Sequence, residues 1–240
     1  MPVYRLGDGV GFPPAENAGR DGLLAVGGDL SPRRLLRAYG RGIFPWYGQG
    51  EPILWWSPAP RSVLFPAEFH AGSSLRKLLQ RGVFALTFDR AFPDVIDGCA
   101  QARPDQPGTW ITPAMRDAFV GLHRRGFAHS LEAWREGRLA GGVYGLSLGR
   151  CFFAESMFHR ESNASKVALA ALAAVLLKMD FIFIDCQLPS PHLAAWGARP
   201  IPRRRYLQLL RAGLRFRTWR GDWGETMQSA LRDVAPALRS

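Results

Sequence analysis

Two apolar segments of the chain contain polar side chains that could do chemistry. Glu155 stands in the middle of the run Phe152–Phe158, where an unpaired carboxylate is costly to bury. Such a carboxylate needs either an internal partner or a cationic ligand. One of the many arginines of the chain could supply an internal ion pair, and this structural alternative stays open beside the ligand-binding interpretation.

The second segment is Phe181–Leu193, in which an apolar strand is followed by Asp185 and Gln187. Residues two apart on a strand point to the same side, so we predict that both side chains lie together at the strand end. The ends of sheet strands are common sites for catalytic groups. In the alternative interpretation, Asp185 caps the following loop and Gln187 faces water.

The sequence lacks the signals of several other kinds of site. It contains no GxxxxGK[ST] or GxGxxG loop for phosphates, no GxSxG elbow and no HExxH pair. Cys99, Cys151 and Cys186 are scattered without CxxC spacing, which argues against a disulfide framework and a zinc site. We therefore expect chemistry without a metal, a nucleotide triphosphate or any other cofactor.

The charge balance favours a polyanionic partner. Lys and Arg number 31 against 20 Asp and Glu, a net charge of +11, and eight arginines but no acidic residue lie between Asp185 and Asp222. A short amphipathic helix capped by Ser74 carries its own cluster of cations on the side away from its leucines. These cations are Arg76, Lys77 and Arg81. Contact with a phosphate backbone is the functional interpretation, and a solvated charged face is the structural one.

Composition divides the chain near residue 62. Residues 1–62 are rich in Gly, Pro and Trp, and only Ser31–Arg41 looks helical, with Ser31 as its N-cap. Residues 63–240 alternate between helices and strands, which predicts a mixed α/β (α+β) sheet domain. The expected strands are 83–88, 128–135, 139–146, 151–157, 181–186 and 199–201. The expected helices are 74–82, 92–102, 112–126, 162–179, one near 192–196 and one from 203.

Nothing in the sequence predicts a membrane protein. The first eleven residues lack the pattern of a signal peptide, and the longest apolar run, Val167–Leu177, is too short to span a bilayer. We expect a cytoplasmic protein, and nothing in the sequence demands a dimer.

Several long motifs together resemble one known family. They are DGLLAVGGDLSPRRLLRAYGRGIFPWY, PILWWSPAPR, TWITPAM, AHSLEAW, GGVYG, FFAESMFHRESNASKVAL, IDCQLPSPHL and GARPIPRRRYL. In this order they resemble the leucyl/phenylalanyl-tRNA–protein transferases, and the similarity runs from about residue 12 to residue 212.

The resemblance implies an acetyltransferase-like (GNAT) catalytic domain with a small N-terminal domain. It further implies transfer of Leu or Phe, and less well Met, from aminoacyl-tRNA to proteins with N-terminal Arg or Lys, which creates an N-degron. The acyl-CoA loop pattern [RQ]xxGx[GA] is missing from HRESNASK, as suits a tRNA donor. Two rivals remain: a non-enzymatic RNA-binding module and an ordinary acyl-CoA acetyltransferase.

By the same resemblance, Glu155 is expected to bind the cationic acceptor, and Asp185 with Gln187 to form the catalytic pair. In the family's proposal Asp185 polarises Gln187 as a base; we favour a Gln187 that only orients the amine, because a carboxamide is a very weak base. An apolar pocket for the amino acid is expected from Trp46, Trp110, Val143 and Phe152. Ala154 stands where the family usually has Gly, which leaves the preference between Leu and Phe open.

Overall fold

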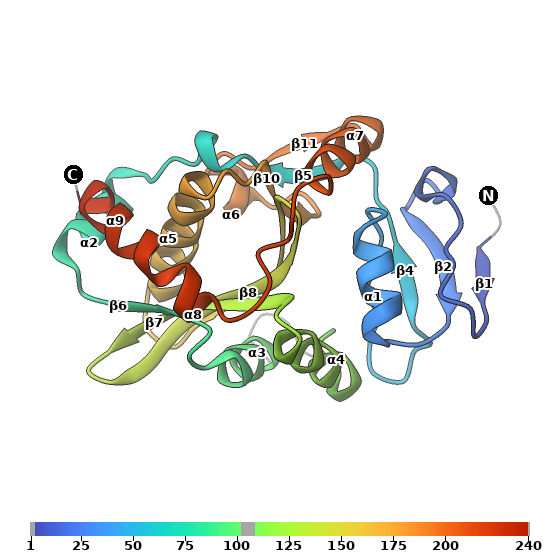
Figure 1. Cartoon of the computed structure of the whole chain (residues 1–240), viewed down its shortest axis with the longest axis horizontal. Helices are drawn as coiled ribbons and strands as arrows, with labels where there is room; N and C mark the ends of the chain where they lie inside the picture. The colour runs from blue at the N-terminus through green and yellow to red at the C-terminus, as the bar shows by residue number, and fades with distance from the viewer. Residues whose placement is uncertain (1–2, 102–108, 240) are drawn as a thin grey trace.

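A computed structural model describes residues 3–101 and 109–239, and it confirms a mixed α/β architecture. Its strands form two separate mixed sheets, one at each side of the helix α1 (Figure 1). The helices are α1 (Pro32–Tyr39), α2 (Ser73–Arg81), α3 (Phe92–Ala100), α4 (Pro113–Arg124), α5 (Ala164–Lys178), α6 (Pro191–Ala194), α7 (Arg203–Gly213), α8 (Trp223–Thr226) and α9 (Gln228–Arg239). Ala102, the predicted end of the third helix, lies outside the described residues.

The N-terminal part is more regular than its turn-rich composition predicts. Four short strands pair in the order β1 (Tyr4–Leu6), β2 (Leu23–Gly27), β4 (Leu54–Trp56) and β3 (Phe44–Pro45). The predicted helix is present as α1, with the Ser31 hydroxyl accepting a hydrogen bond from the Arg34 amide as its N-cap. The strands escaped prediction because each is too short to show a period of two.

The larger sheet contains the candidate chemistry. Its order is β11 (Arg199–Ile201), β5 (Arg61–Leu64), β10 (Phe183–Gln187), β9 (Cys151–His159), β8 (Arg138–Leu148), β7 (Ala128–Arg135) and β6 (Ala85–Phe88). Only β9 and β10 pair in parallel; the other neighbours are antiparallel. The predicted strands of this region are confirmed, whereas β5 was not predicted.

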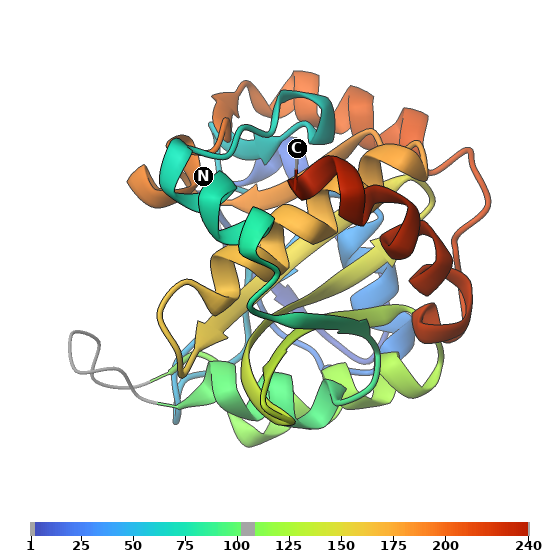
Figure 2. The same cartoon turned by 90° about the vertical axis from the view of Figure 1, so that its left-hand side faces the viewer.

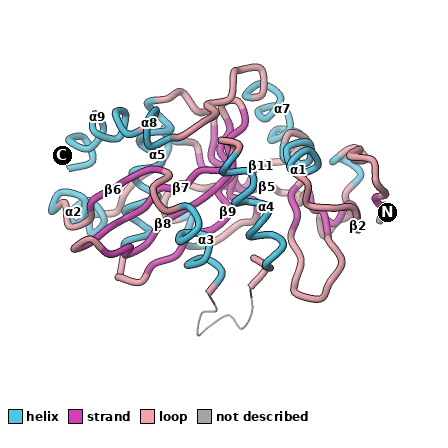
Figure 3. Tube along the Cα trace, turned by 60° about the horizontal axis from the view of Figure 1, so that its bottom comes forward, coloured by secondary structure: helices cyan, strands magenta, loops and turns pink. Residues whose placement is uncertain are grey.

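Helices cover both faces of the larger sheet. The apolar helix α5 packs across β7, β8 and β9 on one face, together with α2 and α9, while α3 and α4 cover the opposite face (Figures 1 and 3). The helix α2 begins after Gly72 without a side-chain cap, so the prediction that Ser74 caps it is wrong. Among the described residues no helix is long and apolar enough to cross a membrane.

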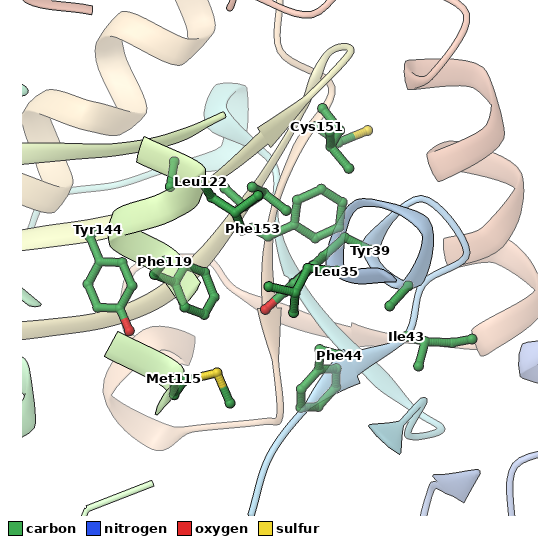
Figure 4. Close-up of a cluster of buried hydrophobic side chains, with 14 of the residues drawn as sticks. Leu35, Tyr39, Ile43, Phe44, Met115, Phe119, Leu122, Tyr144, Cys151 and Phe153 are labelled. Carbon is green, nitrogen blue, oxygen red and sulfur yellow. The ribbon is translucent and has the colours of Figure 1, made fainter. Parts of the chain in front are cut away.

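The N-terminal part shares a core with the larger sheet. Tyr39 of α1 packs edge to face on Phe153 of β9, with ring centroids 5.2 Å apart, and also contacts Phe119 of α4 (Figure 4). All three side chains are fully buried. Removing this much aromatic surface from water holds α1 against the first half of β9.

Candidate active site

The site forms where the two parallel strands of the sheet separate. The pairing of β9 with β10 ends at Phe153 and Asp185, and Glu155 and Gln187 each lie two residues beyond this last pair. The Gln187 side-chain amide donates a hydrogen bond of 3.3 Å to Glu155 Oε1. The structure therefore brings together two of the residues that the sequence singled out, at the point where β10 ends and β9 continues without it, which leaves a gap that a ligand can enter.

A β-bulge turns Glu155 toward this gap. In the β8–β9 ladder Tyr144 pairs with Ser156 and Gly145 pairs with Ala154, so Glu155 is the extra residue without a partner on β8. A bulge of this kind shifts the alternation of the side chains and redirects one of them. The structural alternative, in which an internal arginine neutralises Glu155, is wrong for the described residues, because their ion pairs do not include Glu155.

Glu155 and Gln187 lie in the wall of an open pocket with about 570 Å³ of empty space. The rest of the wall is mostly apolar and comes from Phe44, Pro45, Trp46, Trp110, Cys186 and Leu188. Trp46 and Leu188 are 42% and 41% exposed, which places large apolar side chains on the surface around the pocket. One polar pair in an apolar hollow is typical of a site that orients a small ligand group.

The Glu155 carboxyl has lost most of its contact with water even though the residue itself is partly accessible through the pocket. The pKa of Glu155 is raised to about 8, chiefly by burial; the Tyr39 hydroxyl and Arg61 act to lower it, and nearby Asp185 acts to raise it. The buried Tyr39 hydroxyl faces this carboxyl but has no well-formed hydrogen bond. Near neutral pH the group is thus mostly uncharged, and an arriving cation would favour its ionised form.

Asp185 is fully buried and its carboxylate is already saturated. Arg61 binds both oxygens, with Nε to Oδ1 at 2.8 Å and Nη2 to Oδ2 at 2.7 Å. The Tyr206 hydroxyl donates to Oδ2 at 2.7 Å, and the backbone N–H of Gln187 donates to Oδ1 at 2.9 Å. Asp185 therefore holds the backbone of Gln187, and the Gln187 side chain is bonded to Glu155 instead, unlike the arrangement of the family's proposal, in which Asp185 polarises that side chain.

The period-two geometry expected for Asp185 and Gln187 fails at the end of β10. Asp185 pairs with Val63 and Gln187 with Ser62, so the ladder contains an irregularity between them. Gln187 also adopts a left-handed backbone conformation with φ of 55°, which is uncommon for a residue other than glycine. The side chain of Gln187 consequently turns toward Glu155, whereas Asp185 turns toward Arg61.

Arg61 is the site residue that the sequence prediction missed. Its guanidinium also donates to the carbonyl of Gly42 and lies over the rings of Phe44 and Tyr206, 4.7 Å and 4.6 Å from their centroids. In the sequence, a single arginine before an apolar run predicts only an exposed residue at the start of a strand. Only the tertiary structure reveals that it is enclosed.

The four residues predicted to line an aminoacyl pocket do not lie together. Trp46 and Trp110 are in the wall of the pocket beside Glu155. Val143 and Phe152 are 2% and 1% exposed and belong to the core cluster beneath α5, so they do not line this pocket. The alternation along β8 and β9 directs these two side chains to the other face of the sheet.

Two of the three predicted RNA-binding cations line a second hollow, with about 1080 Å³ of empty space. Lys77 and Arg81 come from α2, and Asn163 and Lys166 come from the start of α5. The third predicted cation, Arg76, is exposed on α2 but is not part of this wall. Within the described ranges no group of three or more potential ligands could hold a metal ion.

Comparison with known proteins gives one consistent result. The sequence model described as "Leucyl/phenylalanyl-tRNA protein transferase" matches residues 63–211, and that of its N-terminal domain matches residues 28–59. Relatives named leucyl/phenylalanyl-tRNA–protein transferase include one from Desulfatibacillum aliphaticivorans, 55% identical over 96% of this chain and 100% of the relative. Others come from Syntrophus aciditrophicus, 54% identical over 96% and 97%, and Syntrophobacter fumaroxidans, 57% identical over 88% and 90%.

The raised pKa of Glu155 predicts a pH-dependent stability. The folded state keeps the proton up to about pH 8, whereas an unfolded glutamate loses it near 4.5, so the wild-type protein loses stability as pH rises between these values. Glu155→Gln cannot ionise. Its Tm relative to the wild type should therefore increase between about pH 5 and pH 8 and change little above that.

Thermal unfolding of both proteins across this range measures the effect. Glu136→Gln is the matched control, because Glu136 is exposed at a hairpin tip and stays in water in both states. A Tm difference for Glu155→Gln that is constant from acid to alkaline pH would contradict a buried, protonated carboxyl.

Proposed function

The chain belongs to the leucyl/phenylalanyl-tRNA–protein transferase family, and on that premise we propose how its site performs an aminoacyl transfer. The reaction moves Leu or Phe from aminoacyl-tRNA to the α-amino group of a protein that begins with Arg or Lys. The observation that carries this proposal is the Glu155 carboxyl, which has no ion-pair partner among residues 3–101 and 109–239 and is hydrogen-bonded to Gln187 in the wall of an apolar pocket. The product bears a new N-terminal Leu or Phe and serves as an N-degron.

Glu155 selects the acceptor. A guanidinium or ammonium group that enters the pocket supplies the positive charge that the site lacks, and the carboxylate then offers it a charge-assisted hydrogen bond. Burial raises the pKa of Glu155 to about 8. Ionisation of this group therefore gives no binding free energy to an uncharged acceptor, whereas a cationic acceptor is stabilised by the carboxylate charge. The preference for Arg and Lys follows because burial makes an ionised Glu155 unfavourable until a cationic side chain binds beside it.

Gln187 orients the attacking amine. Its side-chain nitrogen is bonded to Glu155, which leaves the carbonyl oxygen of the amide to accept a hydrogen bond from the acceptor's α-amine. Asp185 is a positioning residue in this scheme, because it binds the backbone N–H of Gln187 and its oxygens are occupied by Arg61 and Tyr206. Because these oxygens are occupied, we assign Asp185 no part in moving the amine proton to the ribose oxygen.

The transfer itself needs no further activation. The neutral amine attacks the ester carbonyl carbon, the bond from that carbon to the ribose oxygen breaks, and the amine proton passes to the leaving ribose hydroxyl. An α-amine with a pKa of about 7.7–8.0 is partly neutral at physiological pH, so positioning supplies much of the rate. The ester already stores the free energy that an ATP-dependent ligation would have to provide.

The donor occupies the same pocket from its open side. Trp46 and Trp110 offer flat apolar surfaces to the aminoacyl-adenosine end of the tRNA, and aromatic rings of this kind stack well on bases and apolar side chains. Lys77 and Arg81 then contact the phosphate backbone, with Arg76 adding charge on the same helix. All of these groups come from one chain, so we propose a monomer that acts in the cytoplasm, where aminoacyl-tRNA is found.

A transfer assay tests the reaction against its rivals. We expect label to pass from leucyl-tRNA to an Arg-starting peptide and no acetyl group to pass from acetyl-CoA. Glu155→Gln should raise KM for the peptide on the order of tenfold or more and leave KM for leucyl-tRNA within about twofold. Binding of tRNA without transfer would support the RNA-binding module, and equal losses for both substrates would overturn the role of Glu155.

The role of Gln187 is tested by pH–rate profiles. If Gln187 only orients the amine, Gln187→Ala should lower kcat/KM at every pH and keep the rise that accompanies deprotonation of the acceptor amine near 7.7–8.0. Gln187→Glu, which retains an acceptor oxygen, should recover part of the rate. Disappearance of the alkaline rise in Gln187→Ala would instead identify Gln187 as the base.

The cationic hollow is tested by salt dependence. Lys77→Gln and Arg81→Gln should each weaken leucyl-tRNA binding and reduce the slope of log Kd against log salt by about one. Arg138→Gln on the exposed β7–β8 hairpin is the control and should leave the slope unchanged. Slopes that stay at the wild-type value in both α2 variants would remove this hollow from the tRNA contact.

A further inference from the structure

The segment that follows α7 lies beyond residue 211, where the match to the family's catalytic sequence model ends. It contributes no residue to the pocket of Glu155. After α7 it runs past the β8–β9 turn, where the Thr218 hydroxyl accepts a hydrogen bond from the Gly149 amide, and ends in α8 and α9, at the end of the molecule far from the N-terminus (Figure 1). In Figures 1 and 2 α9 lies beside α2 and α5, and the packing of α9 on these two helices agrees with this arrangement.

Trp223 anchors this segment to the sheet. Its backbone N–H donates to Asp89 Oδ2 at 2.8 Å, and the same carboxylate binds His129 Nδ1 at 2.8 Å and the Ser130 amide at 2.9 Å. The His129 and Trp223 rings stack at 4.0 Å with 7° between their planes. Trp223 is fully buried. Such a large buried aromatic fixes the start of α8 firmly on β7.

Gln228 closes the edge of the sheet next to this anchor. The edge strand β6 would otherwise present unpaired backbone groups. The Gln228 side chain accepts a hydrogen bond from the Phe88 amide at 3.2 Å and donates one to the Leu86 carbonyl at 3.2 Å. Since α2 leads directly into β6, the same segment holds both the helix and the strand that follows it.

The helix α9 connects α2 with α5. Leu75 and Leu79, the buried leucines of α2, share a core cluster with Leu231 of α9 and with the apolar face of α5. On the solvent side Lys178, in the last turn of α5, pairs with Asp233 of α9 at 2.5 Å. The helix α2 is short and lacks a side-chain cap, so its position depends on these tertiary contacts.

The two helices that α9 joins are the two main walls of the cationic hollow. Lys77 and Arg81 belong to α2, whereas Asn163 and Lys166 belong to the start of α5. We propose that residues 219–234 act as a brace that sets the spacing of α2 and α5, and thereby the affinity of this hollow for the tRNA backbone. This inference rests on the proposed function for its substrate, and it makes Leu231 a positioning residue that touches neither substrate.

The test compares two donors with the full-length protein. Leu231→Ala opens the contact between α9 and α2 and should raise KM for leucyl-tRNA on the order of tenfold. KM for leucyl-adenosine, a donor without a tRNA body, should stay within about twofold. Hydrogen–deuterium exchange should show faster exchange of the α2 amides in this variant, because the helix loses its support.

Leu122→Ala is the matched control. Leu122 is fully buried in the other core cluster, on α4, and its truncation removes the same number of atoms without touching α2. It should lower Tm comparably and leave the ratio of the two KM values unchanged. Gln228→Ala, which loses the two bonds to β6, is the milder second variant if Leu231→Ala fails to fold, and it should shift the ratio in the same direction.

The outcomes separate this inference from the function on which it rests. Equal changes for both donors, or a ratio that shifts as much in Leu122→Ala, would overturn the brace. If the wild type itself gains no affinity from the tRNA body, the proposed tRNA contact at the hollow is wrong. The exchange data then decide alone: α2 amides that exchange no faster in Leu231→Ala than in Leu122→Ala would overturn the brace.

Discussion

The site depends on one buried ion pair, between Arg61 of β5 and Asp185 of β10. Neither side chain has more than 1% of its surface exposed, and removing one partner of such a pair typically costs about 3–5 kcal/mol because the other charge remains buried. Arg61 also binds the Gly42 carbonyl, and Asp185 also binds Tyr206. The pair thereby joins the N-terminal part, two neighbouring strands and α7 at the point where β10 ends.

This pair explains why two nearby acidic residues have different roles. Asp185 has Arg61 as its counter-ion and also accepts hydrogen bonds from the Tyr206 hydroxyl and from the backbone N–H of Gln187. Glu155 forms no ion pair with any residue that the structure describes, and burial raises its pKa to about 8. The two carboxyl groups therefore have separate roles. Asp185 maintains the geometry of the site, and Glu155 responds to a cationic ligand.

The sequence predicted a substantial part of this arrangement. Glu155 is a polar residue within a run of phenylalanines, and Gln187 directly follows a buried strand. Polar residues at positions where the local pattern is apolar tend to mark functional sites. The structure places Glu155 and Gln187 in contact, as expected from that reasoning. Val143 and Phe152 lie in the core and not in the wall of the pocket beside Glu155, because a bulge and the strand alternation decide which face a side chain occupies, and bulges leave no clear signal in one sequence.

By itself the sequence determined the mixed α/β class, most strands and helices of the larger sheet, the excess of positive charge and the residues around which chemistry could occur. These follow from periodicity, caps and composition, which are local properties. Only the tertiary structure decided that Arg61 neutralises Asp185 and that no described arginine forms an ion pair with Glu155. Arg61 and Asp185 are 124 residues apart. Which of several arginines reaches which carboxylate depends on the order of strands in the sheet, and that order is a property of the whole chain.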